Sequence, residues 1–252
     1  MHTTGAKAFH LAVLVCFAAA VSGRAVDYSQ GVLDRDKVIE VAATLTTNTY
    51  PNADMVWVDE HMRVDYRADG TSSSWDDEYI KVLTEKGKRS RSTISLHYSL
   101  PYETVEVLKL EVIKPDGRVN PIDIEQQSRV MTDRSQMAAN IYNPNHKILR
   151  VTVPDLEVGD IVHILSHEET VKPRVPDTWS DYRIFEYTAP LKRIVYEVSG
   201  PKDLPLDNIK LAAEIPGTVT YTSDGTNAGN LYRWEVSDVP RMFPEPNMPR
   251  LY

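Results

Sequence analysis

The sequence is almost free of cysteine. The only one among its 252 residues is Cys16, which lies in the apolar run from Leu11 to Val21. That run follows Lys7 and precedes small residues ending at Ala25, which is the pattern of an export signal over residues 1–25. We therefore expect an exported protein (periplasmic, cell-surface or secreted) whose mature chain has no disulfide.

Without cysteine, the mature chain also lacks a thiol nucleophile and a thiolate metal ligand. It cannot perform cysteine-protease or transglutaminase chemistry alone, and a hydrophobic core must stabilise the fold. Val15 stands before Cys16, where a bacterial lipoprotein would carry a small residue. We therefore expect the signal to be removed rather than lipid-anchored.

An excess of positive charge is also missing. Lysine and arginine number 28 against 36 acidic residues, which gives a formal net charge of −8, and the acids are scattered along the chain. Such a surface repels nucleic acid and anionic membranes. The apolar run of the signal is too short to cross a bilayer as a helix. We therefore expect no nucleic-acid partner and no membrane span.

Common catalytic motifs are absent too, including G-x-S-x-G and the glycine-rich phosphate loops. "HEETV", which starts at His167, resembles a zinc-protease motif, but Val171 occupies the place of the second histidine. His163 and His167 are four residues apart in a predicted strand, about 13 Å, which is too far to share an ion. We therefore predict no catalytic, cofactor-binding or metal-binding residues, and interpret both histidines as structural or surface residues.

Carboxylates and aromatic side chains remain as candidates for a site. Adjacent acids in one strand point to opposite faces, so they do not form the facing pair that a glycosidase needs, and we interpret them as exposed. Aromatic residues could stack on sugars or peptides, but in strands they are more often core. The acids are Asp76, Asp77, Glu78, Asp155, Glu157, Glu168 and Glu169, and the aromatics are Trp57, Trp75, Tyr98, Tyr102, Trp179, Tyr182 and Trp234.

One helix is predicted, within a lead-in over residues 26–51. Asp34 is a suitable N-cap, and Val38, Ala42 and Leu45 follow at helical spacing, together with Val41. A short helical turn is also compatible with "IDIEQQSRVM".

Strand patterns dominate the rest. Even positions from Val56 to Tyr66 are mostly apolar, whereas odd positions from Asp59 to Asp65 are charged, so this segment predicts a strand with one buried face. The apolar phase flips at Val107–Leu108, which suggests a bulge or burial on both faces. Other strand-like stretches are "YIKVLTEKGKRS" with a turn around Gly87, "HKILRVTV", "DIVHILSH", "YRIFEYTA", "RIVYEV", "GTVTYTS" and "LYRWEV".

These strands recur about every 10–15 residues without helices between them. The spacing predicts an all-β fold, an antiparallel β-sandwich of immunoglobulin-like or larger type, over residues 52–240. A long loop is expected over residues 129–145, and a proline-rich linker over residues 241–252.

The stretch "VPDLEVGDIVHI", from Val153 to Ile164, is predicted to connect two strands. Leu156 and Val158 are expected on the core, with the acids between them in water. Gly159 permits a positive φ, and Asp160 can accept hydrogen bonds from nearby backbone amides.

The mature chain resembles the domain of unknown function that precedes a transglutaminase-like domain in many exported bacterial proteins, the transglutaminase-associated N-terminal domain. The resemblance rests, in order, on "NADMVWVDEHMRVDYRADG", "YIKVLTEKGK", "VEVLKLEVIKPDGRV", "VPDLEVGDIVHI" and "LYRWEVSDVPRMFPEPNMP". It implies an all-β, immunoglobulin-like or related sandwich without known catalytic residues. In the family, the chain usually continues into a Cys-His-Asp domain that acts on peptide or amide bonds.

Taken together, these observations predict a non-enzymatic exported β-sandwich that supports or presents a transglutaminase-like or protease-like partner, or binds a peptide or glycan. One alternative is a fragment of a split or truncated transglutaminase-like enzyme, whose catalytic domain acts in trans or was lost. Another is a carboxylate-based hydrolase.

Overall fold

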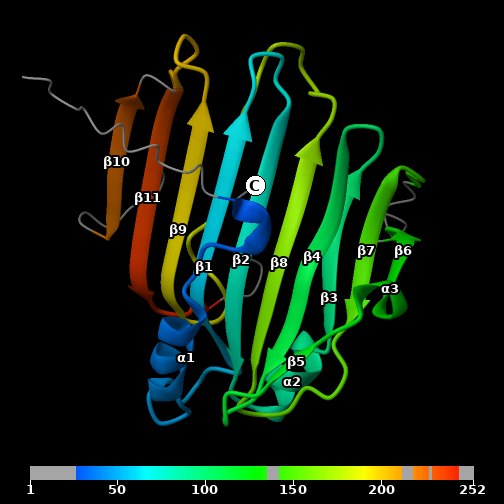
Figure 1. The fold of residues 1–252 in the computed structure, drawn as a ribbon, viewed down its shortest axis with the longest axis vertical. Coiled ribbons are helices and arrows are strands. Elements are labelled where there is room, and N and C mark those ends of the chain that lie inside the picture. Colours follow the sequence, from blue (N-terminus) through cyan, green and yellow to red (C-terminus); the bar gives the residue numbers. More distant parts are fainter. Residues whose placement is uncertain (1–26, 135–141, 212–217, 227–228, 244–252) are drawn as a thin grey trace, which may run out of the picture.

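The computed structural model describes residues 27–134, 142–211, 218–226 and 229–243, which form two β-sheets and short helices (Figure 1). The elements are η1 (Tyr28–Gln30), α1 (Arg35–Thr44), β1 (Met55–Tyr66), β2 (Ser72–Val82), α2 (Glu85–Arg91), β3 (Thr93–Ser99), β4 (Glu103–Ile113), β5 (Val119–Pro121), α3 (Ile124–Gln127), β6 (Ser128–Thr132), β7 (His146–Thr152), β8 (Ile161–Thr170), β9 (Leu191–Gly200), β10 (Val219–Thr226) and β11 (Gly229–Val239). The predicted signal and residues 244–252 of the predicted linker lie outside the described residues. No helix in the described ranges is long and apolar enough to cross a membrane.

The predicted all-β sandwich with a short N-terminal helix is confirmed. The large sheet has the order β10-β11-β9-β1-β2-β8-β4-β5, and the small one has the order β3-β7-β6 (Figure 1). The small sheet packs on the β4–β8 part of the large sheet, since Ile94 and Val151 share a core cluster with Leu110 and Ile164. We call this covered side of the large sheet the inner face.

A loop covers the rest of the inner face. Trp179, Phe185 and Tyr187, from the segment between β8 and β9, pack on a cluster that includes Tyr196 and Trp234. The stretch "YRIFEYTA", predicted as a strand, lies in this segment and forms no strand. Its backbone does not pair with a sheet edge. The alternation arises because its aromatic side chains pack on the sheet.

The strand pairing departs from the prediction at one place. All pairs in both sheets are antiparallel except β1 and β9, which run parallel. A parallel neighbour requires a long crossover, and the chain between β1 and β9 contains most of the other strands. The pairing joins distant parts of the sequence, so periodicity alone could not reveal it.

The even positions of β1 are buried, as predicted. They do not lie on one face, however, because the register with β2 shifts between Trp57 and Asp59. Val56 and Val58 join a cluster with α1, whereas Met62 joins the inner-face cluster. A bulge therefore divides one apolar row between two faces. The bulge predicted at Val107–Leu108 is confirmed, with a register shift between Val107 and Lys109, whereas the bulge in β1 was not predicted.

Helix α1 begins at the predicted N-cap, since the Asp34 side chain accepts hydrogen bonds from the amides of Asp36 and Lys37. Val38 and Ala42 are buried against the opposite side of the large sheet, the outer face, while Val41 is exposed. The helix thus caps the lower end of β1 and β2 in Figure 1.

Two further short helices are present. Helix α3 confirms the predicted helical turn. Helix α2 replaces the turn expected around Gly87, because Thr84 caps the amide of Gly87. Seven residues are too few to show a helical period. A Cβ at Gly87 would lie 2.0 Å from the Asp54 carbonyl oxygen, so this residue must be glycine for close packing.

The predicted connection before β8 is largely confirmed. Leu156 is buried, Gly159 has a φ of 97°, and the carboxylate of Asp160 accepts a hydrogen bond from the Glu157 amide at 2.7 Å. Val158 is exposed, contrary to expectation. The tight hydrogen-bonded turn directs its side chain to solvent instead. Asp155 also has a positive φ, of 54°.

Candidate functional site

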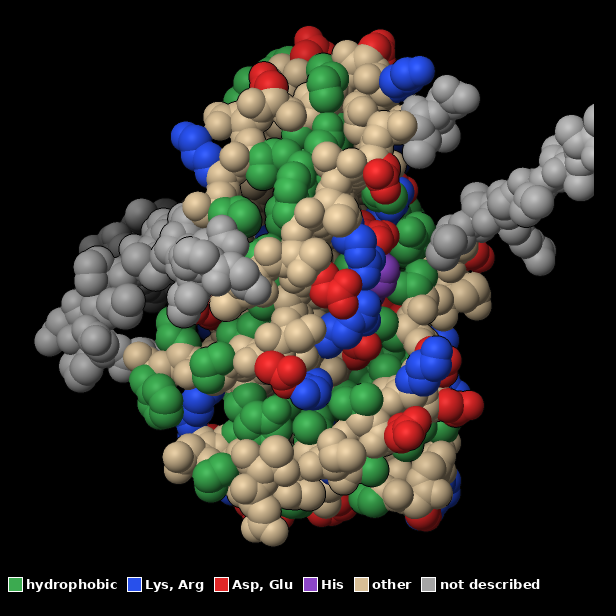
Figure 2. All heavy atoms as spheres, turned by 90° about the vertical axis from the view of Figure 1, so that its left-hand side faces the viewer, with side chains coloured by type: hydrophobic (Ala, Val, Ile, Leu, Met, Phe, Trp, Pro, Cys, Tyr) green, Lys and Arg blue, Asp and Glu red, His purple; other side chains and the backbone are tan. Residues whose placement is uncertain are grey.

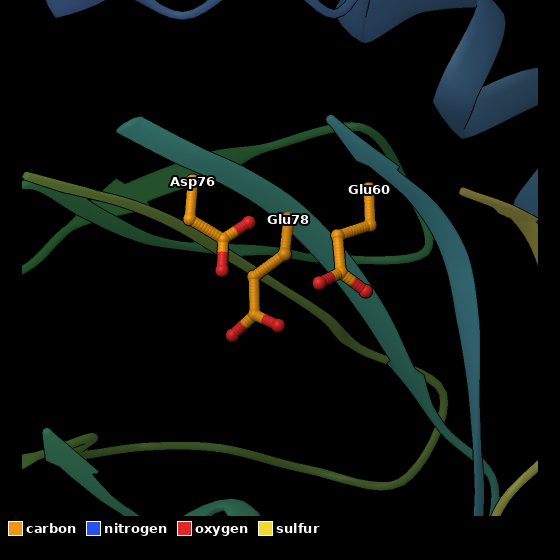
Figure 3. A group of neighbouring side chains, drawn as sticks. All are labelled: Glu60, Asp76 and Glu78. Carbon is orange, nitrogen blue, oxygen red and sulfur yellow. The ribbon is translucent and has the colours of Figure 1, made fainter. Parts of the chain in front are cut away.

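Three carboxylates meet on the inner face of the large sheet. Asp76 and Glu78 are two residues apart on β2, so they share a face, and Glu60 lies directly opposite Glu78 on β1. One oxygen from each of the three lies within 4.8 Å of the others. Figure 3 shows the three groups projecting from the two neighbouring strands toward the same space. We call this set the inner acid cluster.

Among the residues that the structure describes, the side chains that hydrogen-bond to the inner acid cluster are neutral. The Tyr187 hydroxyl lies 3.3 Å from each carboxylate oxygen of Glu60, and the indole nitrogen of Trp57 donates to Glu78 at 3.2 Å. Oδ1 of Asp76 is fully buried and has no hydrogen-bond partner in the described part of the chain. Within the described ranges, none of the three carboxylates forms an ion pair.

This surrounding shifts the protonation of the cluster. Burial raises the pKa of Asp76 to about 8, with the nearby Glu78 charge adding to the effect. Burial also raises the pKa of Glu60 well above its ordinary range, and the charges of Asp76 and Glu78 add to that. Desolvation and like charge both disfavour the ionised carboxylate. The cluster therefore holds protons at neutral pH unless a cation replaces them.

A cavity of about 220 Å³ adjoins the cluster at Asp76. Polar side chains from three strands line it, including Ser74, Ser166 and Glu168, with Arg183 from the covering loop. Arg183 is itself about a third exposed and pairs with Asp181, with Nε 3.0 Å from the carboxylate oxygen. The cavity thus offers oxygen ligands and room for water beside the cluster.

On the outer face, the buried carboxylates have hydrogen-bond partners. The ring of His163 bridges two acids, with Nε2 2.9 Å from Asp77 and Nδ1 3.0 Å from Glu111. The amides of Val32 and Leu33 also donate to Asp77. Burial alone would raise the pKa of Asp77, but the hydrogen bonds outweigh it and the pKa is lowered. This bridge fixes the N-terminal segment onto the sheet.

A network of charges continues across β1, β9 and β11. Glu197 pairs with Arg63 and Arg233, and lies 3.2 Å from the Nε2 of His61. Although burial opposes it, these partners lower the pKa of Glu197 to about 2. Asp59 is an exception, because burial outweighs its pairing and raises its pKa. From the β10 side, charges of both signs intermingle in a band across the molecule (Figure 2).

The structure places the sequence-predicted acids in several environments. Asp155 and Glu157 are exposed, as expected, but Asp77 is fully buried and Glu168 is partly buried. The interpretation of Asp76, Asp77 and Glu78 as an exposed run is therefore wrong. The prediction that adjacent acids point to opposite faces is correct for Asp76 and Asp77. Asp76 and Glu78, however, are two residues apart and share a face, where Glu60 of β1 joins them. The sequence feature that could have revealed this site is Glu60, a charged residue among the otherwise apolar even positions of β1.

The predicted histidines and aromatic residues also differ in burial. His163 is buried in its carboxylate bridge, whereas His167 stacks on Trp75 with ring centroids 5.1 Å apart. Trp234 is a core residue, but Tyr182 is 61% exposed, so the core interpretation fails there. Trp57, Trp75, Tyr98, Tyr102 and Trp179 are partly buried.

Comparison with known proteins gives one family and one related fold. The profile of DUF3857, a domain of unknown function with a solved structure, matches residues 68–243. A crystal structure of a candidate protease from Parabacteroides distasonis is similar at a TM-score of 0.63 and 17% identity, covering 79% of this chain and 38% of that one. This similarity shows a shared fold, and the chain spans under two fifths of that protein. No curated protein matches.

Two other solved structures match more weakly. Leukotriene A4 hydrolase from Saccharomyces cerevisiae has a TM-score of 0.34 at 11% identity, covering 79% of this chain and 29% of that one. The CBM3a-L domain of the scaffoldin CipA from Clostridium thermocellum has a TM-score of 0.27 at 14% identity, covering 47% of this chain and 69% of that one. Neither similarity carries an argument about fold or function.

Proposed function

Because the chain belongs to the DUF3857 family, whose function is unknown, we propose that it is a non-enzymatic, exported β-sandwich that supports or presents a protease-like or transglutaminase-like catalytic domain. The observation that carries this proposal is the relation to the Parabacteroides protein. Most of this chain matches it, but the match covers only 38% of that longer chain. The larger remaining part can hold the catalytic residues of a protease, with the shared sandwich as an accessory domain.

The inner face supports an accessory role over hydrolysis. Its cavity of about 220 Å³ is smaller than the roughly 300–1,000 Å³ of typical ligand pockets. Tyr187 and Trp57 occupy positions against Glu60 and Glu78, so a sugar or peptide bond could not approach these carboxylates without moving the covering loop.

A carboxylate-based hydrolase is the second candidate, and one observation favours it. Asp76 and Glu168 line the same cavity, and burial raises the pKa of each. A protonated acid beside a second carboxylate is the arrangement of a general acid and its partner. Two variants of the accessory role are also compatible with these observations. In one, the chain binds a peptide or glycan without catalysis; in the other, it is a fragment of a split or truncated enzyme.

The two candidates are separated by assaying the purified full chain. We expect no hydrolysis of peptide or glycan and no transamidation. We also expect the activity or solubility of a Cys-His-Asp catalytic domain to rise when it is co-expressed with this chain. Two results together would refute the accessory role and support the hydrolase. The chain alone would hydrolyse peptide or glycan, and Asp76→Asn would abolish this activity. The control Asp116→Asn, in an exposed turn, would leave it intact.

A further inference from the structure

The inner acid cluster poses a problem of charge. Three carboxylates share a desolvated space, and no lysine, arginine or histidine in the described part of the chain pairs with any of them. The charges of Arg183 and Arg91 favour the ionised form of Asp76, but burial and the charge of Glu78 outweigh them. The Arg183 guanidinium forms its ion pair with Asp181 instead. Buried charges persist in proteins when they are paired, protonated or bound to a metal. A shared cation is the solution that uses all three groups together.

The geometry of the cluster selects the kind of cation. All donor atoms are carboxylate oxygens, which hard cations such as Ca²⁺, Mg²⁺ and Mn²⁺ prefer, and no nitrogen or sulfur ligand is offered. Two oxygens on opposite sides of Ca²⁺, each at about 2.4 Å, are about 4.8 Å apart, whereas around Mg²⁺ they are about 4.2 Å apart. The three oxygens lie within 4.8 Å of one another, so they are close enough to share one ion of either size. Ca²⁺ is favoured because it accepts irregular geometry, whereas Mg²⁺ demands a near-ideal octahedron.

A second observation points to a ligand independently of the number of acids. Oδ1 of Asp76 is a buried acceptor that no hydrogen bond reaches, although nearly all buried polar atoms in proteins find a partner. The cavity of about 220 Å³ begins at this residue, and the hydroxyl-bearing Ser74 and Ser166 line it. It is large enough for the waters that complete the coordination of a calcium ion.

We propose that Glu60, Asp76 and Glu78 form a binding site for one divalent cation of calcium size, with waters in the adjoining cavity as further ligands. The ion would join β1 to β2 and, through the Tyr187 hydroxyl on Glu60, fix the loop that covers the inner face. The inference does not depend on the proposed function, because an accessory domain and a hydrolase could both hold the ion.

Calcium binding to the full chain, after treatment with EDTA and exchange into metal-free buffer, tests the proposal. We expect one ion per chain by isothermal titration calorimetry, with a Kd of about 1 mM or tighter. Ca²⁺ in large excess over Kd should raise the Tm by about 5 °C, and Mg²⁺ by less.

Matched variants locate the ion. Asp76→Asn should weaken binding at least tenfold, while Asp116→Asn, the same substitution at an exposed turn, should leave Kd unchanged. Circular dichroism and the Tm in EDTA show whether the Asp76 variant is folded, which we expect because the change removes an unpaired buried carboxylate. Terbium gives a second readout, since Trp57 donates to Glu78 and should sensitise the luminescence of a bound Tb³⁺ ion. Trp57→Phe should weaken that signal while Ca²⁺ still binds, with the Tyr187 ring beside Glu60 as the remaining sensitiser.

Three results would overturn the proposal. They are no calcium binding by the folded wild-type chain, binding that Asp76→Asn leaves unchanged, and binding lost in Glu168→Gln but kept in Asp76→Asn. The last result would place the ion in the cavity rather than in the inner acid cluster.

Discussion

Asp76 and Asp77 are neighbours on β2, yet the two faces of the sheet give them opposite properties. On the outer face, His163 and two backbone amides hold Asp77, and its pKa is lowered. On the inner face, Asp76 lies beside Glu60 and Glu78, and burial raises its pKa to about 8. Side-chain type and local sequence are the same. The difference comes from partners that other strands and the N-terminal segment bring, and it makes the inner face a place for protons or a cation.

The largest effect is expected on the outer face, from His163→Leu. The substitution removes the ring that bridges Asp77 and Glu111 and leaves both carboxylates without that partner. Breaking a buried charged network in this way costs about 3–5 kcal/mol. Urea unfolding followed by circular dichroism measures the change, with His97→Leu as control, since the His97 side chain is 59% exposed and should matter by less than about 1 kcal/mol. Equal stabilities of the two variants would show that the bridge does not hold the outer face.

The neighbouring aspartates provide the sharpest contrast. Asp77→Asn should destabilise the chain by about 2 kcal/mol, because an amide nitrogen cannot accept the hydrogen bonds that now reach both oxygens. Asp76→Asn should stabilise it by about 1 kcal/mol in metal-free buffer at pH 8, because it removes an unpaired buried charge. Urea unfolding of both variants with EDTA present tests the signs. Destabilisation of similar size by both would remove the distinction between the faces.

The pH dependence of stability should reflect both faces. The raised pKa of Asp76 means that the folded state binds more protons than the unfolded state between about pH 4 and 8, so stability falls as pH rises through this range, by roughly 1 kcal/mol per unit. The pKa of Glu197, lowered to about 2, contributes stability above pH 4.5 that is lost as pH falls below it. From these two groups, metal-free wild type should therefore be most stable near pH 4.

Variants assign the two arms of that profile. Asp76→Asn should flatten the alkaline arm and leave the acid arm, whereas Glu197→Gln should lower and flatten the acid arm. Thermal unfolding from pH 3 to 9 shows this as the dependence of Tm on pH. An alkaline arm unchanged in Asp76→Asn would mean that another group causes it.

Much of the fold follows from local patterns in the sequence. The alternation in β1, the Asp34 cap of α1, the bulge after Val107 and the positive φ of Gly159 were all predictable, because each depends on a few neighbouring residues. The parallel pairing of β1 with β9 was not predictable, since it joins segments separated by most of the chain.

The candidate site needed information that one strand does not contain. The spacing of Asp76 and Glu78 places them on one face, but only the register of β1 on β2 brings Glu60 opposite Glu78. The bulge after Trp57 decides which face Glu60 occupies. Without it, Glu60 would follow Val56 and Val58 toward α1, and the inner acid cluster would not form.

The most direct test of the contrast between the faces is a carboxyl ¹³C NMR titration of Asp76 in the full chain, with and without Ca²⁺. In metal-free buffer we predict a midpoint near pH 8, and with saturating Ca²⁺ a midpoint below about pH 5, because the cation favours the ionised carboxylate. A metal-free midpoint near the ordinary value for aspartate would contradict the account. It would mean that partners stabilise the ionised form of Asp76 against burial, as they do for Asp77.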